Sequence, residues 1–133
     1  MRLAAVVFRI AGVWGVLVLV PMYFLFDQPA GAYDAPIPYP QAYHGFVSVA
    51  LAWQFAFLVI AADPVRFRPL MIPAMLEKFG YVVASAFLYA QAQIGRYELT
   101  TVLPDFVLGA LFVLAYLRTP PQRSAAVVER EHR

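Results

Sequence analysis

The chain has 133 residues, of which 62% are hydrophobic and 14% charged, and its mean hydropathy is +0.68. A soluble domain carries roughly 45–50% apolar and about 25% charged residues, so a soluble fold of this length would leave many apolar side chains in water. The absence of cysteine excludes disulfides, Cys-ligated zinc, iron–sulfur clusters and a thiol nucleophile. The net charge of +2 does not indicate a nucleic-acid partner, because the basic residues flank apolar runs.

Four apolar runs, at 10–26, 46–62, 79–95 and 99–117, dominate the sequence. A helix needs about 20 residues to cross a bilayer, with a range of roughly 17–25. Hydrocarbon cannot satisfy backbone polar groups, and the runs do not alternate as barrel strands do, so each run is predicted to form a transmembrane α-helix. We expect an all-α, polytopic membrane protein with one four-helix transmembrane domain over residues 1–121. Its helices are predicted at about 5–26, 44–62, 70–94 and 99–118, with a charged cytoplasmic tail over 122–133.

The segments between the runs contain residues that interrupt helices. Asp63-Pro64 closes the second run, and Pro69 stands where a third helix could begin, a favoured place for proline. Thr119-Pro120-Pro121 ends the fourth run. The first connection, 27–43, contains Pro29, Gly31, Pro36, Pro38 and Pro40.

The basic residues predict the orientation. Nine of the ten lysines and arginines fall on or near one side of the predicted membrane, and Arg96 alone falls on the other. Because loops rich in lysine and arginine stay in the cytoplasm, both termini are predicted to be cytoplasmic, in the inner (plasma) membrane of a bacterium. The nine are Arg2, Arg9, Arg66, Arg68, Lys78, Arg118, Arg123, Arg130 and Arg133.

The first run also has features of a cleaved signal peptide. Basic residues precede it, and the small residues Ala30-Gly31-Ala32 follow it. Its apolar stretch is longer than the core of a usual signal peptide, so we expect it to be retained as a helix.

Glu77 is the foremost candidate for a site. If the third helix begins near Leu70, Glu77 lies roughly 10 Å inside it and shares one face with Tyr81 and Ser85. That face would turn a ligand-binding or proton-binding carboxylate toward the bundle interior, since an intramembrane acid is usually paired or functional. The alternative is that residues 70–76 lie along the interface and that Glu77 lies among the headgroups.

Lys78 projects about 100° away from Glu77 on a helix, so it is predicted to be a poor partner that extends to the cytoplasmic headgroups. Tyr81, Arg68 or Arg9 are the expected partners of Glu77.

Asp105 is the second candidate. It shares a helix face with Gly109, Phe112 and Tyr116, and Gly109 would let another helix approach closely. Asp105 is either a carboxylate that faces an internal cavity or an interfacial acid in the first turn after Pro104, where the helix dipole favours it.

The second helix offers two further ligand-binding candidates, Gln54 near its middle and His44 at its outer end. Gln54 needs a partner in lipid, either an interhelical hydrogen bond or a substrate. His44 is either solvated or a ligand contact. In the first helix, Gly12 and Gly15 predict a face that packs against another helix, whereas aromatic residues such as Trp14 and Trp53 are expected to face lipid.

No complete motif for a metal, a nucleotide or a nucleophile is present. The two histidines and the separated acids lack the spacing of metal ligands, and no serine lies near a histidine in a recognised arrangement. We therefore expect no metal and no cofactor.

Short strings along the chain resemble small four-helix membrane proteins of two groups, the EXPERA group (emopamil-binding sterol isomerases and the sigma-2 receptor) and the DoxX-like group. They are Tyr39-Pro40, Gln54-Phe55, Arg68-Pro69 and Leu117-Arg118-Thr119-Pro120. The resemblance to the EXPERA group implies a bundle with a cavity for a hydrophobic ligand, gated by carboxylates on the first two helices. This chain departs there, because its second run has no acid and Asp27 lies at the end of its first helix, so isomerase activity is not carried over.

The expected function is binding of a hydrophobic ligand, such as a lipid, a sterol-like molecule or a quinone, within the helix bundle. The alternative is an accessory subunit of a larger membrane complex, and a second alternative is a membrane isomerase or redox partner. The expected partners are membrane lipids, together with partner membrane subunits or a second copy of the chain.

The basic bias predicts a topology that reporters can measure. A reporter fused after Arg133 should read as cytoplasmic, and one inserted near Ala35 should read as external. An external carboxyl terminus would contradict the four-helix topology.

Overall fold

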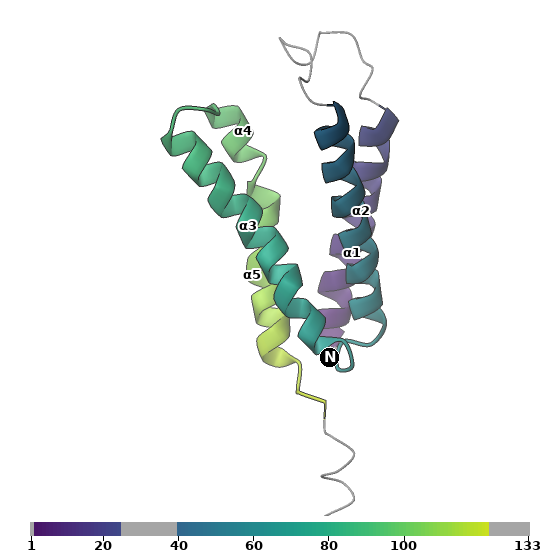
Figure 1. The fold of residues 1–133 in the computed structure, drawn as a ribbon. Coiled ribbons are helices and arrows are strands. Elements are labelled where there is room, and N and C mark those ends of the chain that lie inside the picture. Colours follow the sequence, from purple (N-terminus) through teal and green to yellow (C-terminus); the bar gives the residue numbers. More distant parts are fainter. Residues whose placement is uncertain (1, 25–39, 123–133) are drawn as a thin grey trace, which may run out of the picture.

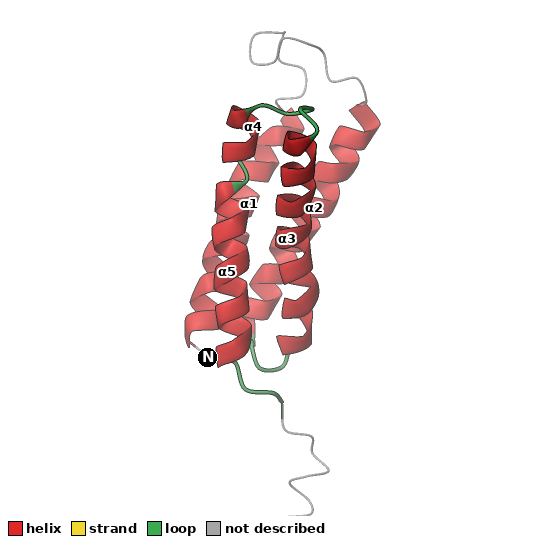
Figure 2. Cartoon of the chain, turned by 90° about the vertical axis from the view of Figure 1, so that its left-hand side faces the viewer, coloured by secondary structure: helices red, strands yellow, loops and turns green. Residues whose placement is uncertain are grey.

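The computed structural model describes residues 2–24 and 40–122, and the regular elements of this part are all helices, joined by short turns (Figures 1 and 2). Its elements are α1 (Arg2–Phe24), α2 (Pro40–Ala62), the 3-10 turn η1 (Arg68–Leu70), α3 (Met71–Ala90), α4 (Arg96–Thr100) and α5 (Leu103–Arg118). With η1 joined to α3 and α4 joined to α5, the described residues form four helical stretches long and apolar enough to cross a membrane. The predicted all-α architecture with four such stretches is confirmed. The tail beyond residue 122 lies outside the described residues.

Two helix ends lie four residues from their predicted positions, each for a local reason. Helix α2 begins at Pro40 rather than near 44. Proline is favoured as a first helical residue, because the N–H that it lacks would have no hydrogen-bond partner within the helix at that position. Helix α3 ends at Ala90 rather than near 94, and Ala92 then adopts a positive φ of 56° that reverses the chain.

The predicted fourth helix is divided into α4 and α5. Pro104 cannot donate the helical hydrogen bond to the carbonyl of Thr100, so the helix is interrupted there. The Thr100 and Thr101 hydroxyls donate to the carbonyls of Tyr97 and Glu98, each at 2.6 Å, which caps the end of α4. The interruption places Asp105 in the first turn of a new helix, α5.

The helices pack as two pairs, α1 with α2 and α3 with α5, and α1 also contacts α5, whereas α2 and α3 touch sparingly. Figure 1 shows the pairs close together near the N-terminus and diverging toward α4. At the closed end three buried rings meet: Phe8 stacks on Phe112 at 4.2 Å, and Phe57 meets Phe112 edge-on at 5.0 Å. This aromatic cluster, Phe8–Phe57–Phe112, joins α1, α2 and α5.

Gly12 and Gly15 lie where α1 meets α2, as predicted. A Cβ atom at Gly12 would lie 2.8 Å from the backbone oxygen of Gln54, and one at Gly15 would overlap the Gln54 side chain. The close approach of the two helices therefore depends on glycine at these positions.

We predict that Gly12→Ala lowers the free energy of unfolding by about 1–3 kcal/mol, because the methyl group must displace backbone. The matched control is Gly80→Ala on the exposed face of α3, where a Cβ meets nothing within 4 Å. That variant should be neutral or gain up to about 1 kcal/mol from helix propensity. Thermal unfolding in detergent, followed by circular dichroism, compares them; equal midpoints would contradict the close packing at Gly12.

Candidate functional site

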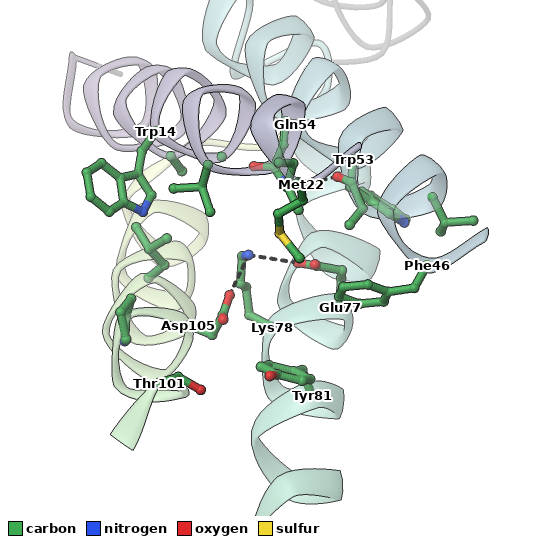
Figure 3. Close-up of a pocket in the computed structure, with 18 residues that line it drawn as sticks. Trp14, Met22, Phe46, Trp53, Gln54, Glu77, Lys78, Tyr81, Thr101 and Asp105 are labelled. Atoms are coloured by element: carbon green, nitrogen blue, oxygen red, sulfur yellow. Dashed lines mark hydrogen bonds and ion pairs between the residues drawn. The ribbon is translucent and has the colours of Figure 1, made fainter. Parts of the chain in front are cut away.

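A cavity of about 430 Å³ lies between the two helix pairs (Figure 3). Its wall is largely apolar and includes Trp14, Phe46 and Trp53. Helices α1, α2, α3 and α5 all contribute to it, together with Thr101. Its polar lining residues are Gln54, Glu77, Lys78, Tyr81, Thr101 and Asp105.

Three charged side chains form an ion cluster on the cavity wall, Glu77–Lys78–Asp105. The Lys78 ammonium donates a hydrogen bond to Asp105 Oδ1 at 2.6 Å and lies 3.3 Å from Glu77 Oε2. Lys78 is only 6% exposed, and its Nζ lies 5.5 Å from the centre of the Phe57 ring. A buried ammonium without partners would cost several kcal/mol, so these carboxylates are what allow lysine to occupy this position.

The surrounding backbone explains why α3 and α5 meet here. Asp105 occupies the first turn of α5, where unpaired N–H groups favour a carboxylate. One turn further on, a Cβ at Gly109 would lie 3.4 Å from the Lys78 Cβ and 3.0 Å from the Phe79 ring. Glycine thus brings α3 close enough for Lys78 to reach Asp105, as the sequence predicted for Gly109. Asp105 lies in the first helical turn after Pro104 and also lines the cavity, so these parts of its two interpretations hold together. Its position at the membrane interface stays a prediction.

The prediction for Lys78 is wrong. The Lys78 side chain lies in the ion cluster instead of extending to headgroups. The reason is that α5 packs against the face of α3 that carries Lys78 and brings Asp105 to the ammonium. The expected partners of Glu77 are wrong for the same reason, since its ion partner is Lys78. Arg9 is exposed, and Arg68 instead donates from Nε to the Thr119 carbonyl at 2.8 Å.

Glu77 lies within α3, which begins at Met71, so the condition for an inward-facing carboxylate is met. Its side chain is 23% exposed and lines the cavity. Tyr81, one turn further on, also lines the cavity and is 42% exposed. Ser85 is buried but does not line the cavity, so the predicted polar face reaches the cavity only through its first two residues.

The two candidates on α2 are separated. Gln54 is buried and lines the cavity, and its Nε2 donates to the Ala50 carbonyl at 2.9 Å. The expected interhelical hydrogen bond is therefore replaced by one within α2. His44 lies outside the cavity near the start of α2, where its Nδ1 is 2.9 Å from the Pro40 carbonyl and its ring lies against Tyr23.

Lys78 and both tryptophans were not predicted from the sequence as members of the site. Trp14 and Trp53, expected to face lipid, line the cavity, and Trp14 is also 56% exposed. A signal for Lys78 was available, because it is the only lysine in the sequence and Asp105 is the only acid within the fourth apolar run. An acid within a membrane span needs a partner, which favours that pairing.

Comparisons with protein-family models, curated proteins and solved structures found no match to this chain. The resemblance to the EXPERA and DoxX-like groups stays an expectation from short strings.

The ion cluster predicts strong energetic coupling between Lys78 and Asp105. Lys78→Met leaves two carboxylates without a counterion and should cost about 3–5 kcal/mol of stability, the usual cost of breaking a buried pair. Adding Asp105→Asn should recover a large part of this loss, because one uncompensated charge disappears with it.

Circular dichroism in detergent measures the four midpoints of this double-mutant cycle. Additive effects of the two substitutions would show that the pair is not coupled and would contradict the ion cluster.

Proposed function

We propose that this protein binds a small hydrophobic molecule, such as a lipid, a sterol-like molecule or a quinone, in the cavity between its two helix pairs. The observation that carries the proposal is the cavity itself, about 430 Å³ in volume, with apolar and aromatic walls and one ion cluster. Pockets for small molecules typically measure about 300–1,000 Å³ and combine such walls with a few placed polar groups.

The distribution of polar side chains supports this proposal. Glu77, Lys78 and Asp105 face inward, whereas large apolar side chains on the outer faces are exposed, including Ile10, Leu17, Phe55, Val83 and Leu117. Such a surface suits a lipid environment, because an apolar exterior of this extent would be unstable in water.

We place the protein in the inner membrane of a bacterium with both termini in the cytoplasm. Removing Lys78 from the nine basic residues of the cytoplasmic side leaves eight against one, so the bias persists.

An accessory role in a larger membrane complex is the alternative. It requires apolar outer faces that partner helices could cover, and those faces are present. It does not require an internal cavity lined by charged side chains. The cavity therefore favours ligand binding over the accessory role.

The proposal predicts that the protein retains a hydrophobic molecule through purification in mild detergent. Native mass spectrometry should find one such molecule per chain. Ala50→Phe, which places a ring in the cavity, should abolish retention. The matched control, Ala52→Phe on the exposed face of the same helix, should retain the molecule.

Wild-type protein that carries no small molecule and co-purifies with other membrane subunits would contradict the proposal and support the accessory role. Equal retention by both phenylalanine variants would place any bound molecule outside the cavity.

A further inference from the structure

We propose that the cavity selects ligands whose head group donates a hydrogen bond, a hydroxyl or an ammonium, to the Glu77 carboxylate. This inference rests on the proposed function, because it names the chemistry of the molecule that the cavity binds. It separates the candidate ligands: an alcohol, such as a sterol-like hydroxyl or a reduced quinol, fits, whereas an oxidised quinone carbonyl or a carboxylate does not.

The ion cluster has more hydrogen-bond acceptors than donors. Its two carboxylates accept one hydrogen bond within the described part of the chain, from Lys78 Nζ to Asp105 Oδ1. Glu77 Oε2 is buried and accepts none, although it lies 3.3 Å from Nζ as an ion pair. The Glu77 side chain as a whole is 23% exposed and lines the cavity, so a ligand reaches the carboxylate from there. A carboxylate short of donors is unfavourable, and a donor brought by a ligand would relieve that cost.

The two donors nearest to Glu77 in the ion cluster and on α2 each have another acceptor. Lys78 donates to Asp105, and Gln54 Nε2 donates to the Ala50 carbonyl. Among the residues that the structure describes, Lys78 is also the only basic one that lines the cavity. A ligand carboxylate would therefore meet two carboxylates with one shared counterion. A ligand that only accepts hydrogen bonds would bring no donor to Glu77.

The surrounding side chains leave room for an apolar tail. Figure 3 shows the three charged side chains turned toward one another, with Trp14 on one side and Phe46 and Trp53 on the other. A head group at Glu77 would leave the rest of the ligand against these aromatic walls, where apolar burial contributes affinity.

The two tryptophans allow this inference to be tested. Trp14 and Trp53 are the only tryptophans in the sequence, and both line the cavity. Trp14 is also 56% exposed, so 1-bromododecane, an apolar probe without a donor, quenches it from the bilayer as well. The saturable part of the quenching, absent in Ala50→Phe, would report occupation of the cavity. The protein is placed in nanodiscs of zwitterionic lipid, and the probe is displaced with 1-dodecanol, dodecylammonium, dodecyl methyl ether or dodecanoate at equal mole fractions in the bilayer.

We expect dodecanol and dodecylammonium each to displace the probe at concentrations at least about tenfold lower than the methyl ether, the effect of one hydrogen bond to a charged acceptor. Dodecanoate should be the weakest of the four. In Glu77→Gln the preference for alcohol over ether should fall to about threefold or less, because a neutral amide is a weaker acceptor. The control Asp63→Asn removes an exposed carboxylate outside the cavity and should keep the full preference.

The outcomes separate this inference from the proposed function. Saturable quenching with equal displacement by dodecanol and its ether, or strongest displacement by dodecanoate, overturns the inference and leaves hydrophobic binding standing. Preference for dodecylammonium alone overturns it in favour of charge pairing. If quenching does not saturate in the wild type and is as strong in Ala50→Phe as in the wild type, both this inference and the proposed function are overturned. The wild-type comparison of alcohol with ether decides the matter even if Glu77→Gln does not fold.

Discussion

The hydrogen-bonded ion pair between Lys78 and Asp105 is the constraint on which the rest of this structure depends. It joins α3 to α5 inside an apolar bundle and holds the lysine beside Glu77. A buried ion pair rarely stabilises a fold more than apolar residues of the same volume would, whereas losing one partner is costly. Stability alone therefore gives little reason for these three charged residues, and what they offer to the adjacent cavity is a better explanation of their presence.

The cavity follows from unequal packing between the helices. Glycines bring the helices within each pair into close contact, Gly12 and Gly15 between α1 and α2, and Gly109 between α3 and α5. Between the pairs, the aromatic cluster Phe8–Phe57–Phe112 closes one end, and the helices diverge from there (Figure 1). Close packing within pairs and divergence between them leave a partly open cavity whose polar wall is the ion cluster.

Hydrophobic run length predicted the four helices, because a span has few alternatives in hydrocarbon. Helical periodicity placed Glu77 and Tyr81 on the cavity side of α3 and Gly109 at a helix contact. Periodicity failed for Lys78, because the angle between two residues of one helix does not reveal which side chain of the neighbouring helix, here Asp105, lies against them. The break before α5 depends on Pro104 acting together with two threonine hydroxyls, and the cavity depends on how the pairs diverge. The break is local, because each threonine hydroxyl donates to a carbonyl three residues back. The divergence of the pairs is set by tertiary contacts that a one-dimensional pattern does not contain.

The most direct test of the central claim is nitrogen-15 NMR of the lysine side chain in lipid nanodiscs. Lys78 is the only lysine in the sequence, so selective labelling yields one ammonium resonance. A buried, hydrogen-bonded ammonium should exchange its protons slowly with water, and its resonance should shift strongly in Asp105→Asn. A fast-exchanging resonance that Asp105→Asn leaves unchanged would show a lysine that reaches the headgroups, and would contradict the account.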